Sequence, residues 1–338
     1  MLVVISPIIK FLFNRLLLLS ITINTAQTVY AEEELWQFNH TLQTNLQTYN
    51  ESEDRKDAQN AGYYISADYL DSGSLAFSYN HTLVNLGNNA DVTENLYFLS
   101  GQYHQYPDSM PGKLSLRIDS YFGKDTLEYS LNSPPPTTPG PGQGPGHGKF
   151  KTNRAASDTV KESIDINAYY LHCAFINYKK TFYTDIGYAY SKYSAASKTI
   201  VKQITPSVGF GWNDSYDWIQ WRAYFIDLQK DTSAFNDDKF ESLETKYTHW
   251  FTDEVSSKLE FIRFTFLTGK RVLAVDPDTT TIYSITDLQK TSLSGSIQWK
   301  ITKNKKVLAA IQYDEYRNTT LTDNYDSYLF YISLQFRN

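Results

Sequence analysis

The chain has 338 residues and a net charge of −6, and hydrophobic residues make up 41% of it. This composition excludes a bundle of membrane-spanning helices, which needs long apolar runs. An acidic chain is also a poor candidate for binding nucleic acid, so we expect no such partner. Aromatic residues reach 15%, led by 27 tyrosines. That balance suits a transmembrane β-barrel, whose strands face lipid on one side and water on the other and whose interfaces carry aromatic girdles.

The first 31 residues have the organisation of a secretory signal. Lys10 and Arg15 precede an apolar run from Leu16 to Ile23, and a polar stretch then ends at Ala31. A basic region, a short apolar core and a small residue before the cut predict a signal peptide over residues 1–31, cleaved after Ala31. The alternative is a membrane anchor, but the apolar run is far shorter than the roughly 20 residues that span a bilayer.

Strand patterns recur through the rest of the chain, and no amphipathic helix of useful length interrupts them. Strands in soluble proteins are usually about 5–6 residues long, whereas crossing a bilayer at a tilt takes about 9–11. The patterns here favour the longer kind. They predict fourteen strands over residues 35–48, 62–70, 74–84, 92–105, 113–122, 161–178, 181–193, 199–212, 216–228, 240–252, 255–268, 289–302, 306–317 and 325–337.

The connections between these strands alternate in length. After even-numbered strands they are mostly tight turns: 71–73, 179–180, 213–215, 252–254 and 303–305, with a longer one at 107–112. After odd-numbered strands most are longer and polar: 49–61, 123–160, 229–239, 269–288 and 318–324, with 85–91 and 194–198 as short exceptions. Outer-membrane barrels have this asymmetry, so we expect the short turns in the periplasm and the long loops outside the cell.

Several strands have one apolar and one small polar face. In 292–301, Leu293, Ile297 and Trp299 alternate with Ser294, Ser296 and Gln298. The polar set is too hydrophilic for the core of a sandwich, and a water-filled lumen accepts it. Strand 255–268 changes phase near Ile262, which predicts a β-bulge there.

The loop predicted at 123–160 contains a segment of foreign composition. Residues 133–148 consist mainly of Pro and Gly. Because such a segment cannot supply a sheet with donors or form a core, we expect an extended extracellular loop. One interpretation is a tolerated low-complexity insertion. The other is a functional segment that makes a surface contact or forms a flap over the pore.

The final strand alternates most strictly. Every second residue from Tyr328 to Phe336 is apolar or aromatic. This stretch resembles the closing strand of bacterial outer-membrane β-barrels, although Arg337 and Asn338 follow the terminal aromatic residue. The resemblance implies outer-membrane lipid and lipopolysaccharide as surroundings, and the barrel assembly machinery as a partner during biogenesis. A soluble sandwich strand is the alternative for this stretch alone. The whole pattern predicts an all-β fold, a closed antiparallel up-and-down transmembrane barrel of about 14 strands over residues 32–338.

Signals for catalysis or cofactors are weak. No two of the six histidines, and no histidine and Cys173, have metal-ligand spacing. The carboxylate clusters at 236–238 and 276–278 lack the spacing of an EF-hand loop, so we expect solvated turns there. No nucleophile motif is found. We therefore expect no enzyme, no metal and no cofactor. Cys173 lies inside a predicted strand, which favours a buried thiol.

The charged residues assigned to the lumen are the candidate functional residues. They would tune selectivity if unlike charges faced one another across the pore; alternatively, they would pair and hold the wall together. We expect the pore to be open, or narrowed by the loop at 123–160 or 269–288 folding inward. The pore-lining candidates are Lys113, Arg117, Asp119, Asp165, Asp185, Arg222, Glu244, Lys246 and Lys300.

The sequence favours a monomeric channel for passive diffusion of small hydrophilic solutes. One alternative is the barrel of an assembly or export system for surface proteins or lipoproteins. The last two strands are generically similar to the barrel part of surface lipoprotein assembly modifiers, but the periplasmic repeat domain of those proteins is not found here. A further alternative is a surface adhesion or structural protein with a closed lumen.

Overall fold

The computed structural model describes residues 35–87, 90–130, 159–194, 198–230, 237–252, 258–279, 282, 287–318 and 323–338. The predicted signal peptide and the Pro/Gly-rich residues 133–148 lie outside these ranges. Within them, no helix is long and apolar enough to cross a membrane.

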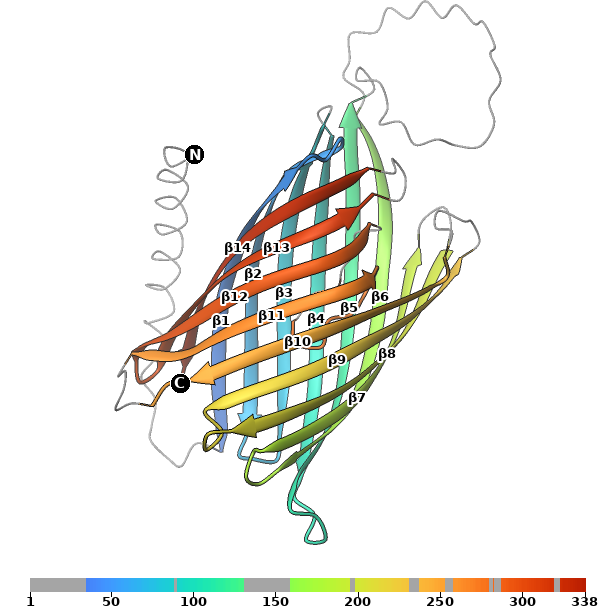
Figure 1. Cartoon of the computed structure of the whole chain (residues 1–338). Coiled ribbons are helices and arrows are strands. Elements are labelled where there is room, and N and C mark those ends of the chain that lie inside the picture. Colours follow the sequence, from blue (N-terminus) through green and yellow to red (C-terminus); the bar gives the residue numbers. More distant parts are fainter. Residues whose placement is uncertain are drawn as a thin grey trace, which may run out of the picture.

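Fourteen antiparallel strands form a closed barrel, which confirms the predicted fold class (Figure 1). Each strand pairs with its neighbours in sequence, and β1 pairs with β14, so no edge is left unpaired. The strands are β1 (Trp36–Asn50), β2 (Arg55–Tyr69), β3 (Gly73–Leu86), β4 (Ala90–Gln105), β5 (Gly112–Ser130), β6 (Thr159–Asn177), β7 (Phe182–Ser194), β8 (Lys198–Trp212), β9 (Asp217–Lys230), β10 (Lys239–Trp250), β11 (Leu259–Arg271), β12 (Leu288–Thr302), β13 (Lys305–Arg317) and β14 (Asn324–Arg337).

The alternation read from the sequence separates the outer and inner faces of the wall. In β12, Leu293 is 54% exposed on the outside, whereas Gln298 is buried on the inside. In β8, Ile204 and Phe210 face outward, whereas Gln203 is buried. Because closure satisfies the backbone hydrogen bonds, a wall that is apolar outside and polar inside fits a bilayer.

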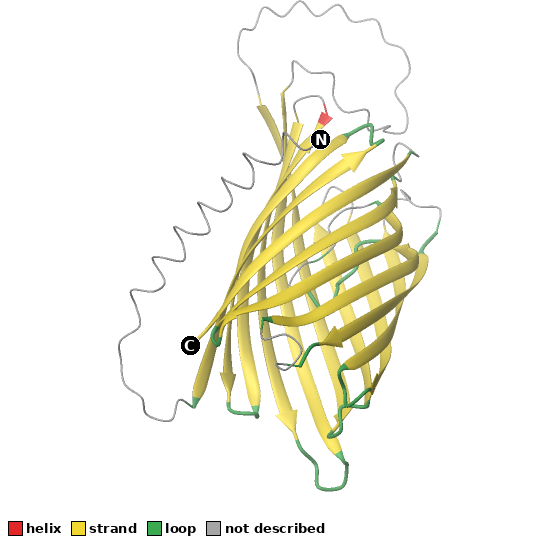
Figure 2. Cartoon of the chain, turned by 60° about the vertical axis from the view of Figure 1, so that its left-hand side comes forward, coloured by secondary structure: helices red, strands yellow, loops and turns green. Residues whose placement is uncertain are grey.

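The seam between β1 and β14 closes the barrel. Its register places Leu46 opposite Phe330 on the outer face and Asn45 opposite Tyr331 on the inner face. The strict alternation of the final strand therefore fixes which of its side chains face outward. Figure 2 shows the short turns gathered at one end of the barrel.

The connections predicted at 49–61 and 123–160 are the ones that shorten most. β2 begins at Arg55, so the connection predicted at 49–61 shrinks to residues 51–54, and β5 continues to Ser130. The first half of β2 has Gln59 and Ala61 exposed on its outer face and Asn60 buried on its inner face. Neither face is apolar here. The backbone hydrogen bonds between β2 and its neighbours therefore begin before the hydrophobic pattern of this strand does.

Two local expectations also change. The bulge predicted near Ile262 lies between Leu259 and Phe261, where the register with β12 shifts. Cys173 is exposed on the outer face of β6 rather than buried. Its neighbour Ala174 is buried on the inner face.

Candidate functional site in the barrel lumen

The described part of the connection between β11 and β12 folds into the barrel. We call residues 272–279 together with Ile282 the inward segment. Val272, Leu273, Ala274 and Val275 are each 3% exposed or less, and Val275 forms an isolated β-bridge with Ile282. The apolar side chains pack against luminal residues of several strands, namely Tyr193, Val201, Ile226, Leu228 and Phe240. The segment therefore has a small hydrophobic core of its own inside the barrel, and the loop predicted at 269–288 is one that folds inward.

Polar side chains of the wall bind the backbone of the inward segment. The Gln203 amide donates from Nε2 to the Val275 carbonyl oxygen at 2.7 Å and accepts from the Val275 nitrogen at 3.0 Å. The Tyr193 hydroxyl donates to the Leu273 carbonyl oxygen at 3.3 Å. Backbone groups outside a strand need such partners when they are withdrawn from water. These bonds hold the segment against β7 and β8.

The tip of the segment is bound by charge. Arg222 donates to both carboxylate oxygens of Asp278, at 2.8 and 3.1 Å, and the Lys246 ammonium binds the same carboxylate. Arg117 donates to the Pro277 carbonyl oxygen at 2.7 Å. Enclosure alone would raise the pKa of Asp278, but Arg222 and Lys246 outweigh it and hold this pKa well below its usual range. Asp278 is therefore a carboxylate at neutral pH.

Asp276 has the opposite electrostatic environment. Burial, together with the nearby carboxylates of Glu244 and Asp278, raises the pKa of Asp276. Arg271, 3.9 Å away, opposes this rise only in part. The residues predicted to form a solvated turn at 276–278 instead lie inside the lumen, because the wall supplies their partners.

Six of the predicted pore-lining residues meet around the inward segment. They come from β5, β7, β9 and β10, and they are Arg117, Asp119, Asp185, Arg222, Glu244 and Lys246. Arg117 is 3.0 Å from the Asp119 carboxylate, which also accepts from Ser100 at 2.6 Å. Most of this charge is therefore paired within the protein.

The other three candidates lie elsewhere. Lys113 is the second residue of β5 and Lys300 lies two residues before the end of β12, so both lie near the short-turn end of the barrel. Asp165 is exposed on the outer face of β6, on the same side as Tyr169 and Leu171. Ile166, Ala168 and Tyr170 face inward instead, to the core around the inward segment. Asp165 therefore does not line the lumen. Because both faces of β6 carry apolar residues, the sequence pattern does not show which face is the inner one.

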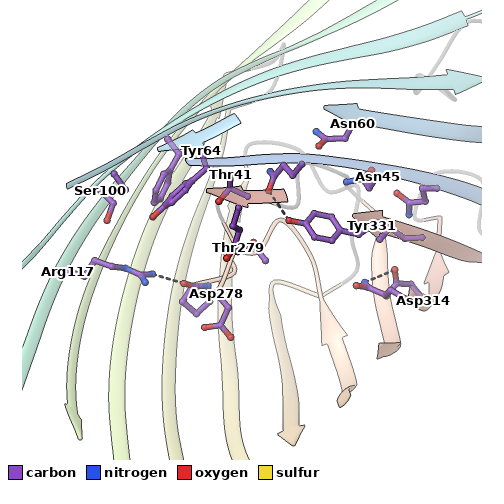
Figure 3. A pocket seen from close by; sticks show the side chains of 18 of the residues that line it. Thr41, Asn45, Asn60, Tyr64, Ser100, Arg117, Asp278, Thr279, Asp314 and Tyr331 are labelled. Atoms are coloured by element: carbon purple, nitrogen blue, oxygen red, sulfur yellow. Dashed lines mark hydrogen bonds between the residues drawn. The ribbon is translucent and has the colours of Figure 1, made fainter. Parts of the chain in front are cut away.

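A cavity of about 520 Å³ lies beside the inward segment (Figure 3). Pro277, Asp278 and Thr279 bound it on one side, and β1 to β5, β13 and β14 form the rest of its wall. Within the described ranges, no three His, Cys, Asp or Glu side chains are grouped to hold a metal ion.

No protein-family model matches the chain, and no curated protein matches it. Solved structures do. The CymD monoaromatic hydrocarbon channel superposes with a TM-score of 0.54 at 8% identity, covering 90% of this chain and 89% of that one. The Ralstonia pickettii toluene transporter TbuX gives 0.51 at 12% identity, with 90% of each chain covered. The fold is that of bacterial outer-membrane β-barrels.

In this outer-membrane barrel fold, the inward segment divides the lumen into two parts. The side next to β6 to β10 is filled by the segment and its apolar contacts. The side next to β1, β2 and β14 retains the polar cavity. The geometry thus leaves a cavity between the inward segment and one side of the barrel wall. Sequence reasoning missed Gln203 and Tyr193, which carry no charge or motif.

Proposed function

We propose that the protein is a monomeric outer-membrane channel for passive diffusion of small hydrophilic solutes, narrowed by the inward segment. The observation that carries the proposal is the polar cavity between that segment and the wall of a closed barrel. Apolar walls would exclude water, whereas amide and hydroxyl groups replace the hydrogen bonds of a hydrated solute. No catalytic role is proposed.

The surroundings follow from the outer face. Side chains such as Leu293, Ile118 and Phe264 are more than half exposed there, which suits contact with lipid and lipopolysaccharide. We place the short turns in the periplasm and the long loops outside the cell. The terminal strand, with its outward Tyr328 and Phe330, is the element that the assembly machinery would recognise.

A second candidate is a channel for aromatic hydrocarbons, as CymD and TbuX are named. Apolar side chains do face the lumen, among them Leu96, Phe98 and Ile166. The inward segment already covers much of this cluster with Val272 to Val275. Most of the side chains that line the cavity carry amide or hydroxyl groups, and this favours hydrophilic solutes.

The two candidates are separated by reconstitution. The full protein in liposomes should admit small sugars, and in planar bilayers it should give a stable single-channel step. Uptake of toluene without sugar permeation would favour the hydrocarbon channel. A closed trace with co-purifying periplasmic proteins would favour an assembly barrel, and a closed trace with binding to surface ligands would favour an adhesion protein.

A further inference from the structure

The charges that border the cavity are already satisfied within the protein. Its only charged lining residues among those described are Arg117, Asp278 and Asp314. Arg117 and Asp278 are bound as described above. Asp314, 1% exposed, accepts from the amides of Gln289 and Gln312 at 2.8 and 2.9 Å. The hydrogen-bonding groups of these charged side chains are therefore already engaged by the protein.

Neutral amides and hydroxyls make up most of the remaining lining. In the described part of the chain, the side-chain amides of Asn45, Gln102 and Gln335 have no hydrogen-bond partner in the protein, although they border the cavity. Each amide offers both donors and an acceptor. A sugar hydroxyl likewise donates and accepts, so such groups complement it better than they complement an ion.

One tyrosine is held in place at the cavity wall. The Tyr331 hydroxyl donates to Gln43 Oε1 at 3.1 Å, and Gln43 Nε2 donates to Asn80 Oδ1 at 2.6 Å. Figure 3 shows Tyr331 and Tyr64 among the side chains around the cavity. A positioned ring offers an apolar face to the C–H groups of a solute while its hydroxyl remains polar.

We propose that this cavity is a binding site for a neutral polyhydroxylated solute of mono- to disaccharide size. The volume, about 520 Å³, lies within the roughly 300–1,000 Å³ of small-molecule sites. The proposal rests on the proposed channel function, because it names the solute class that the channel favours.

Binding is tested separately from transport. Saturation-transfer NMR on the full detergent-solubilised protein, with glucose and sucrose as probes, should detect both sugars. Tyr331→Leu should lower the signal at least about threefold, whereas Tyr328→Leu, on the outer face of the same strand, should leave it unchanged. Absence of transfer, or equal loss in both variants, would overturn the proposal.

Transport gives the second readout. Liposomes containing the full protein should swell at least about threefold faster in glucose than in gluconate or glucosamine, which differ mainly in charge. Equal rates for all three would overturn the inference while leaving the channel intact. If the liposomes swell with no solute but sugar binding still depends on Tyr331, the binding site is supported and the proposed channel function is contradicted.

Discussion

Arg222 on β9 binds both carboxylate oxygens of Asp278, a residue 56 positions later in the chain, at 2.8 and 3.1 Å. The Arg222 side chain is 3% exposed, whereas the Asp278 side chain is 38% exposed and borders the cavity. A bidentate pair of this kind fixes direction as well as distance. It ties the tip of the inward segment to β9 and thereby sets one border of the cavity.

Asp278→Asn should loosen the tip of the segment. The substitution leaves Glu244 as the carboxylate that Arg222 and Lys246 share, with Asp185 4.0 Å from Arg222. Losing a hydrogen bond to a charged group costs about 1.5–3 kcal/mol. We expect noisier single-channel currents and a higher mean conductance in planar bilayers.

Asp237→Asn is the matched control. Asp237 pairs with Lys270 at 3.1 Å, but both side chains are more than half exposed, and such pairs contribute at most about 1 kcal/mol. Currents of this variant should equal those of the unmodified protein. Quiet, unchanged currents in Asp278→Asn would contradict the role given to the Arg222–Asp278 pair.

Gln203→Leu should release the middle of the segment. It removes the two hydrogen bonds to Val275 and leaves a buried N–H and carbonyl without these partners. Each such loss costs about 1–3 kcal/mol, so the two together cost at least about 2 kcal/mol and alter the opening equilibrium about 30-fold or more. Hydrogen exchange of the peptide covering 272–279, followed by mass spectrometry, should accelerate by that factor.

Gln220→Leu separates this effect from a general loss of luminal hydrogen bonds. Gln220 also lies in the barrel wall, but its amide donates to Ser207 at 3.1 Å and not to the segment. Exchange at 272–279 should stay unchanged in this variant. If hydrogen exchange at 272–279 accelerates equally in both variants, the Gln203 hydrogen bonds do not specifically stabilise the segment.

The fold was predictable because its pattern is local. Alternation over a strand such as β12 needs only neighbouring residues, and Leu293 and Gln298 take the predicted faces. The site was less predictable, since its contacts are distant in sequence. Nothing near Arg222 points to Asp278. The apolar run before Asp276 was the available signal, because four consecutive apolar residues rarely stay in an exposed loop.

The error at Asp165 has a related cause. Polarity identifies the inner face only where the lumen is polar, and the inward segment makes part of the lumen apolar. Ile166 and Tyr170 on the inner face of β6 belong to the same buried cluster as this segment. Polarity then no longer identifies the face. The early start of β2 at Arg55 is the complementary case, in which the ladder persists without any apolar face.

Cys173 provides a test of the two faces of β6. As the one cysteine in the chain, exposed on the outer face, it should react in liposomes with a lipid-soluble maleimide and resist a charged one. Moving the thiol by one residue, in Cys173→Ala with Ala174→Cys, should sharply lower the reaction with the lipid-soluble reagent, because Ala174 is buried on the inner face. Equal reaction of both proteins with the lipid-soluble reagent would contradict a lipid-facing outer surface.

Asn45→Asp should make the channel prefer cations. Asn45 borders the cavity and is the cross-strand neighbour of Tyr331. The substitution would add a carboxylate to the cavity wall without a cationic partner. At roughly 8 Å in water, a unit charge attracts a cation by about 0.5 kcal/mol. The cation-to-anion permeability ratio, measured from the reversal potential in a salt gradient, should therefore rise about twofold. Gln59→Glu, with its side chain exposed on the outer face of the adjacent strand, should change the ratio little. An equal shift in both variants would place the permeation path outside the cavity.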